Sequence, residues 1–147
     1  MNQFMNKVLK NQTADILTFC CSLVFFYSAT TKLFDFSGFQ LGLFRNPIIP
    51  HDFAVSVSYL IPILETIIAV LMLFDKSKIK ALIGFFILLV MFTIYIALFW
   101  IMDVERPCSC GGLIAKLSFN MHFILNLFLL LISAYSILLF KKCQSEK

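Results

Sequence analysis

The chain has 147 residues, of which 61% are hydrophobic and only 14% are charged, and 18 of them are phenylalanines. This balance excludes an ordinary water-soluble domain, and the length allows one compact domain over residues 1–147. The net charge of +4 comes mostly from lysines outside the apolar segments, so it indicates membrane topology rather than a nucleic-acid surface.

Four apolar segments follow one another along the chain, each with about 20 residues, the length that crosses a bilayer core as a helix. Because backbone polar groups cannot stay unpaired in lipid, they predict an all-α membrane protein, a bundle of four transmembrane helices. The segments span residues 14–34, 54–74, 81–102 and 117–140.

The first segment is preceded by lysines, as a cleaved signal peptide would be. However, Tyr27 stands where a cleavage site needs a small side chain, so we expect the segment to stay as a membrane anchor. At its outer end Lys32 and Asp35 could pair, or Lys32 could anchor the helix at the membrane interface. Towards the other end we expect Cys20 and Cys21 to be small buried hydrophobes.

The second and fourth segments each carry polar side chains in apolar surroundings. Glu65 lies near the middle of the second, where a carboxylate must be protonated, paired or turned towards an interior cavity. Pro62, one turn earlier, can kink the helix. His122 and Asn126 share one face of the fourth helix, and Asn126 lies within roughly 3 Å of the depth of Glu65, so these two could hydrogen-bond. Each polar side chain could serve function or simply hold helices together.

Basic residues are distributed unevenly between the connections. Eight lie in the N-terminus, the 75–80 turn and the tail, and four lie in the other two connections. By the positive-inside rule both termini are cytoplasmic in a bacterial inner membrane, and residues 35–53 and 103–116 face the periplasm.

The second outward connection contains "RPCSCGG", residues 106–112, with Cys108 and Cys110 one residue apart. A disulfide between them would close a small strained ring, which is easier to reduce than a structural bridge and suits thiol–disulfide exchange. The start of the following helix would stabilise a thiolate. Three alternatives stay open: a static brace, two unpaired thiols, or a soft-metal site made by both cysteines and His122.

Five runs and two polar residues follow one another along the chain. They are "FFYSATTKLFDFSGFQLGL" (25–43), "PIIP" (47–50), "YLIPILETIIAVLMLF" (59–74), "FTIYIALF" (92–99) and "PCSCGG" (107–112), followed by His122 and Asn126. In this order and spacing they resemble the MauE/DoxX-like membrane proteins over most of the chain. Ala29 departs from the related pattern, which usually has Gly after Ser.

The resemblance implies a four-helix inner-membrane protein of thiol redox chemistry. MauE is tied to methylamine utilisation and to maturation of the disulfide-rich small subunit of methylamine dehydrogenase, and DoxX-like relatives are linked to quinone-coupled sulfur oxidation. The resemblance implies that Cys108 and Cys110 carry the redox chemistry. It also extends to four polar positions without assigning them a role: Lys32, Glu65, His122 and Asn126. Methylamine itself is not carried over, because nothing in the sequence recognises an amine.

The leading hypothesis is a membrane thiol–disulfide oxidoreductase that exchanges with a periplasmic thioredoxin-like partner or client. His122 would shuttle the proton, and a quinone would be a natural electron acceptor, although no sequence feature identifies its pocket. The rival hypothesis is a non-catalytic membrane subunit or assembly chaperone that recruits a redox partner. A third is metal delivery through Cys108, Cys110 and His122.

Overall fold

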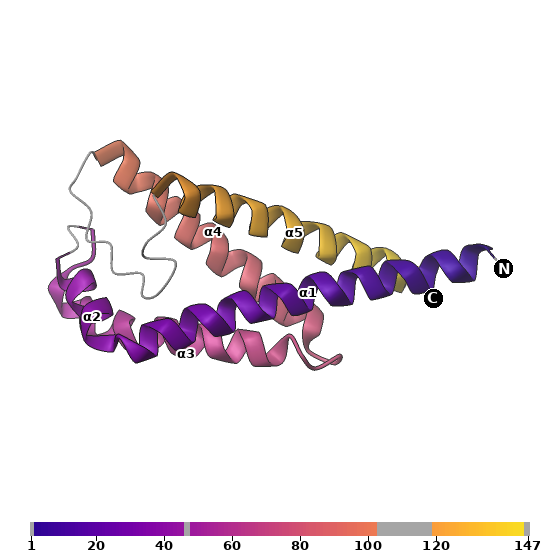
Figure 1. Cartoon of the computed structure of the whole chain (residues 1–147), viewed down its shortest axis with the longest axis horizontal. Helices are drawn as coiled ribbons and strands as arrows, with labels where there is room; N and C mark the ends of the chain where they lie inside the picture. Colours follow the sequence, from indigo (N-terminus) through magenta and orange to yellow (C-terminus); the bar gives the residue numbers. More distant parts are fainter. Residues whose placement is uncertain (1, 46–47, 103–118, 146–147) are drawn as a thin grey trace.

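The computed structural model describes residues 2–45, 48–102 and 119–145, which are helical apart from short connections. Four helices are long and apolar enough to cross a membrane, over Val8–Phe34, His51–Leu71, Lys78–Leu98 and Met121–Lys142. This confirms the predicted all-helical chain with four spans. In chain order the helices are α1 (Asn2–Phe34), α2 (Phe36–Phe44), α3 (His51–Leu71), α4 (Lys78–Met102) and α5 (Phe119–Ser145) (Figure 1).

The ends of the helices differ from those of the predicted segments. The largest difference is in α1, which begins at Asn2 rather than at residue 14, because the polar stretch before the apolar segment contains no helix breaker. In contrast, α3 ends at Leu71, and Leu73 and Phe74 turn back through backbone hydrogen bonds to the carbonyls of Val70 and Leu71. Residues 72–74, the end of the predicted second segment, therefore belong to the connection between α3 and α4.

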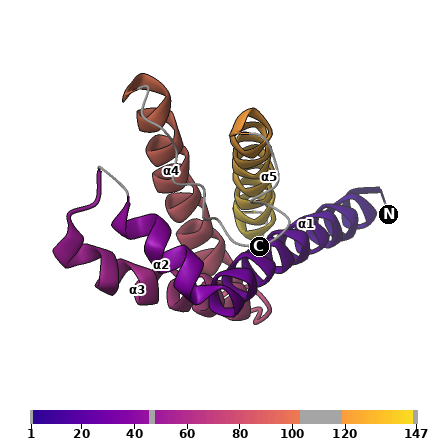
Figure 2. The same cartoon turned by 60° about the vertical axis from the view of Figure 1, so that its left-hand side comes forward.

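The four spans form a ring in which each packs on two neighbours. Helix α1 lies between α3 and α5, and α4 closes the ring by packing on both α5 and α3. The two chain ends lie at the same end of the bundle, and α2 lies at the opposite end (Figure 1). Turning the molecule shows α2 beside α3 and away from α5 (Figure 2).

The interior is made of aromatic rings and small residues, as in packed membrane helices. Phe25 of α1 and Phe85 of α4 are buried, with ring centroids 4.2 Å apart. Ser22 of α1 donates its hydroxyl to the carbonyl of Ala69 on α3 at 2.8 Å, so the backbones of α1 and α3 approach closely there. Large apolar side chains cover the outside, among them Ile16, Phe26, Leu60, Ile94 and Leu131. A surface covered by large apolar side chains suits contact with lipid.

Helix α2 was not predicted, because the 35–53 region was taken as a loop. Asp35 caps it: its carboxylate accepts a hydrogen bond from the backbone N–H of Gly38 at 3.2 Å. Phe39 and Leu43 of α2 are buried together with Ala54 of α3. An aspartate followed three residues later by glycine, and then by an apolar face, was the signal that could have revealed this helix.

Candidate functional site: a buried lysine–glutamate pair

Lys32 on α1 and Glu65 on α3 form an ion pair inside the bundle. The distance between Lys32 Nζ and Glu65 Oε1 is 2.5 Å, and the two residues are 7% and 0% exposed. The hydroxyl of Ser28 completes the contact, because it accepts from Lys32 Nζ at 2.8 Å and donates to Glu65 Oε1 at 3.2 Å. One carboxylate oxygen therefore receives two hydrogen bonds, both from α1.

Helical spacing explains why these side chains meet. Ser28 and Lys32 are four residues apart and lie on the same face of α1. Glu65 belongs to the buried face of α3, which also contains Ala54, Ser58, Pro62 and Ala69. Because α1 and α3 pack against each other, Ser28 and Lys32 on α1 meet Glu65 on α3.

Aromatic rings surround the lysine end of the pair. The centroids of Phe39 on α2 and Phe92 on α4 lie 5.8 Å and 5.4 Å from Lys32 Nζ, within the cation–π range. Gln40 of α2 donates to the hydroxyl of Ser58 on α3 at 3.4 Å. The site thus joins α1, α2, α3 and α4.

The second carboxylate oxygen of Glu65 has no hydrogen-bond partner within the described parts of the chain. A buried acceptor that stays unpaired costs about 1–3 kcal/mol, and more when it is charged. Burying both ions is also expensive, and their attraction repays this only when the geometry is good. The arrangement is therefore costly to build, which is typical of polar groups with a function inside a membrane protein.

The structure decides between the alternatives considered for Lys32 and Glu65. Glu65 is paired, which was one of its predicted states. Its predicted hydrogen bond to Asn126 is not made, because Oε1 is occupied by α1 and Oε2 has no partner. Lys32 neither anchors the interface nor pairs with Asp35, because the Asp35 carboxylate caps α2 and Lys32 turns inward. Ser28 was missed, although a hydroxyl one turn from a membrane lysine was a usable signal.

The other predicted polar residues are only partly described. Asn126 is buried on α5 and His122 is half-buried, one turn closer to the end that holds α2. Cys108 and Cys110 lie outside the described residues. Among the described residues no group of three or more metal-ligating side chains comes together, so the metal hypothesis, which needs both cysteines, stays a prediction.

The cysteines of α1 are both free, but only one behaves as expected. Cys21 is buried in the core between helices, as predicted. Cys20 is exposed on the outer surface, so its prediction was wrong. The reason is geometric: neighbouring residues of a helix point about 100° apart, so both cannot face the same core.

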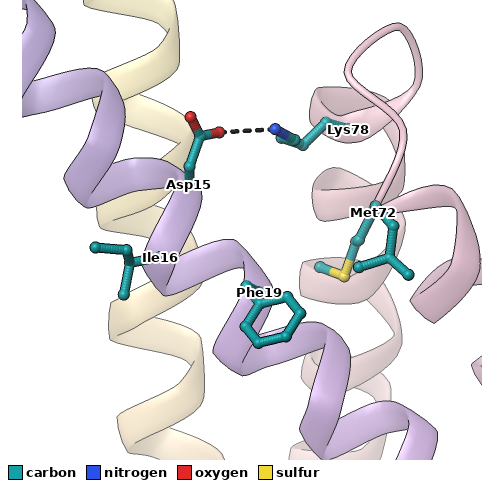
Figure 3. Close-up of a pocket in the computed structure, with 6 residues that line it drawn as sticks. Asp15, Ile16, Phe19, Met72 and Lys78 are labelled. Atoms are coloured by element: carbon teal, nitrogen blue, oxygen red, sulfur yellow. Dashed lines mark hydrogen bonds and ion pairs between the residues drawn. The ribbon is translucent and has the colours of Figure 1, made fainter.

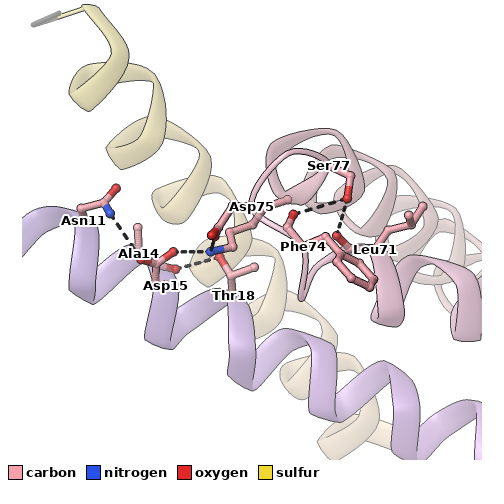
Figure 4. Close-up of polar contacts among 9 residues, drawn as sticks. Asn11, Ala14, Asp15, Thr18, Leu71, Phe74, Asp75 and Ser77 are labelled. Carbon is pink, nitrogen blue, oxygen red and sulfur yellow. Dashed lines mark hydrogen bonds and ion pairs between the residues drawn. The ribbon is translucent and has the colours of Figure 1, made fainter.

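A second polar cluster lies at the opposite end of the spans, where α1 meets the turn between α3 and α4. Lys78 Nζ contacts Asp15 Oδ1 at 2.7 Å (Figure 3) and Asp75 Oδ1 at 2.6 Å (Figure 4). Asn11 donates to the other oxygen of Asp15 at 3.3 Å. The hydrogen bond from Lys78 and its charge lower the pKa of the Asp75 carboxyl from its ordinary value of 3.8. In the sequence, Lys78 is one of the basic residues of the 75–80 turn and indicates only topology.

Four apolar spans that enclose a buried ion pair define a small multi-pass α-helical membrane protein. The model of the family described as methylamine utilisation protein MauE matches residues 10–139, so the chain belongs to the MauE family. The matched range includes Lys32, Glu65, Cys108, Cys110 and His122, and it confirms the family resemblance. No curated protein and no solved structure matches the chain.

Proposed function

We propose that this MauE-family protein is a thiol–disulfide redox protein of the bacterial inner membrane. Its Cys108 and Cys110 pair would exchange disulfides with a periplasmic thioredoxin-like partner or with a disulfide-containing client. The observation that carries the proposal is the family match, which runs through the Cys-x-Cys connection and all four candidate spans.

The topology supports an outward position for the cysteines. Helix α4 ends at Met102 and α5 begins at Phe119, at the end of the bundle away from both termini (Figure 1). The excess of lysines near the termini favours a cytoplasmic location for that end by the positive-inside rule. The connection between α4 and α5 would then face the periplasm, where disulfides form and persist.

From this protein, the exchange needs only the sulfur atoms of Cys108 and Cys110. A thiolate of Cys108 or Cys110 attacks a partner disulfide, a mixed disulfide forms, and the partner's leaving sulfur departs as a thiolate. The remaining thiol, once it has lost its proton, attacks the mixed disulfide and releases the reduced partner. The pair is then oxidised by two electrons, and the same steps in reverse oxidise a client dithiol.

When the pair has oxidised a client dithiol it is left reduced, and its reoxidation requires an acceptor of two electrons and two protons. We propose a membrane quinone for this role, because its reduction to the quinol has this stoichiometry and it is soluble in the bilayer. His122, half-buried near the start of α5, would pass protons at the end of the bundle that carries the thiol pair. Lys32, Glu65 and Asn126 would be positioning residues that keep the spans in register below the thiol pair.

The first test is thiol labelling of intact cells with a membrane-impermeant maleimide, before and after mild reduction, read by mass spectrometry. We expect Cys108 and Cys110 to label only after reduction, whereas Cys143 in the tail, a built-in control for sidedness, stays unlabelled in both samples. Labelling of Cys143 in sealed cells, or failure to label the pair in either sample, would overturn the topology on which the proposal rests.

Serine substitution separates the redox role from its rivals. In cells carrying Cys108→Ser or Cys110→Ser we expect client disulfides to be lost. A non-catalytic assembly subunit predicts that function survives both changes. A metal site predicts that purified protein carries Cu or Zn in a one-to-one ratio, that either substitution removes it, and that added oxidant does not restore function.

A further inference from the structure

The outer face of the bundle is hollowed along the seam between α1 and the end of α3. One hollow has a volume of about 350 Å³ and lies beside Lys78 and Asp15 (Figure 3). A second, of about 210 Å³, continues towards the middle of the bundle. The two share Phe19 and Leu73 in their linings, so they lie next to each other and together make a groove along the seam. We call it the seam groove.

The seam groove has the length and lining expected for one lipid acyl chain. Along α1 its lining runs from Asp15 to Phe26, which at about 1.5 Å per residue is about 16 Å. This is close to half of the bilayer's hydrocarbon core of about 30 Å, the thickness of one leaflet. Apart from Ser22, whose hydroxyl is bonded to the Ala69 carbonyl, the inner hollow is lined by apolar residues.

A polar cluster closes the groove at the end nearer the chain termini, where one candidate span ends at Leu71 and the next begins at Lys78, and we place the headgroup there. The ammonium of Lys78 has three N–H donors, and the contacts described for it, to Asp15 and Asp75, use two of them. Lys78 is also the first residue of α4, where the helix dipole favours a negative charge. A phosphate oxygen is suited to the third donor.

The carboxylates restrict which headgroup can bind. Asp75 has a side chain that is 92% exposed, so it can accept hydrogen bonds from a further cation. Two carboxylates beside one lysine repel a headgroup that is only anionic. They complement a phosphate that carries a primary ammonium a few bonds away, since the ammonium can donate to Asp75 while the phosphate accepts from Lys78.

We propose that the seam groove binds a phospholipid with a primary-amine headgroup, of the phosphatidylethanolamine class, from the leaflet that faces the chain termini. One acyl chain lies along Phe19 and Leu73, the phosphate contacts Lys78, and the ammonium contacts Asp75. The site is independent of the thiol chemistry proposed above, and it ties α1 to the turn between α3 and α4 through a lipid.

The experiment is native mass spectrometry of the full chain, released from micelles that contain equal amounts of three phospholipids with identical acyl chains. The headgroups are phosphatidylethanolamine, phosphatidylcholine and phosphatidylglycerol. The choline headgroup is the matched probe, because its quaternary ammonium cannot donate a hydrogen bond. We expect the ethanolamine lipid to be retained roughly threefold over the choline lipid, as an exposed ion pair allows.

Three variants locate the binding. Asp75→Asn should bring retention of the ethanolamine lipid down to that of the choline lipid. Leu73→Trp places a ring in the stretch that both hollows share and should abolish lipid retention. Ile67→Trp is its control, since Ile67 is an exposed residue of α3, the helix that ends two residues before Leu73, and it lies outside the groove lining. Equal retention of all three lipids, preference for the glycerol lipid, or equal behaviour of the two tryptophan variants would overturn the proposal.

Discussion

Lys32 and Glu65 are 33 residues apart in the sequence and lie in direct contact, 2.5 Å between Nζ and Oε1, inside a bundle whose other buried side chains are mostly apolar. The contact ties the C-terminal end of α1 to α3. Because both ions are buried, the cost of burying each charge is offset by its attraction to the other.

We expect Lys32→Met and Glu65→Gln each to destabilise the bundle by about 3–5 kcal/mol, the usual cost of leaving one partner of a buried ion pair alone. The double variant should be more stable than either single variant, because no uncompensated ion remains. Thermal unfolding in detergent, followed by circular dichroism, gives the four midpoints of the cycle. A double variant that loses the sum of the two single losses would show that the residues are not coupled.

Ser28→Ala removes the hydroxyl that bridges Lys32 and Glu65, and we expect a loss of about 1–3 kcal/mol, typical for a hydrogen bond to a charged group. Thr30→Ala is the matched control on the same helix. Within the described parts of the chain, the hydroxyl of Thr30 bonds only to the carbonyl of Phe26 in α1, so its removal should change the unfolding midpoint little. Equal losses in the two variants would mean that the bridge contributes nothing.

Two substitutions of Asp35 test whether its side chain acts as a helix cap or as an ion-pair partner. Asparagine caps a helix about as well as aspartate, so Asp35→Asn should leave α2 intact, whereas Asp35→Ala should cost about 0.5–2 kcal/mol. Hydrogen exchange of the α2 amides, Phe36–Phe44, is the measurement. If loss of the charge alone speeds exchange, Asp35 acts as an ion-pair partner and the cap assignment is wrong.

The Asp75 contact sets a pH dependence. Because contact with Lys78 lowers the pKa of Asp75, the carboxylate stabilises the folded protein above its ordinary pKa of 3.8, and this contribution is lost as the pH falls through the lowered value. The difference in unfolding midpoint between the protein and Asp75→Asn should therefore be constant from neutral pH down to about 4 and shrink below it. The effect is small, because the side chain is exposed to solvent. A difference that vanishes already between pH 6 and 5 would contradict the assigned contact.

Much of the fold could be predicted because long apolar runs in lipid have few alternatives to helices, and the four spans follow from that constraint. Helix α2 was not predicted, because it is too short to show as a span; the Asp35 cap was the local signal for it, and its position depends on burial of Phe39 against α3. The pairing of Lys32 with Glu65 was also out of reach. Depth along each helix can be counted from the sequence, but which helices are neighbours, and how each is rotated, is decided by packing of side chains such as Phe25 and Phe85.

The unexpected length of α1 has a mechanical consequence. A continuous helix of 33 residues is about 50 Å long, well beyond the hydrocarbon core of about 30 Å that it crosses. Its first turns run past the other spans at the end that holds both termini (Figure 1). Because the helix is continuous from these turns to Lys32, we expect a fluorophore or a fused domain at the N-terminus to report the tilt of α1 from outside the membrane.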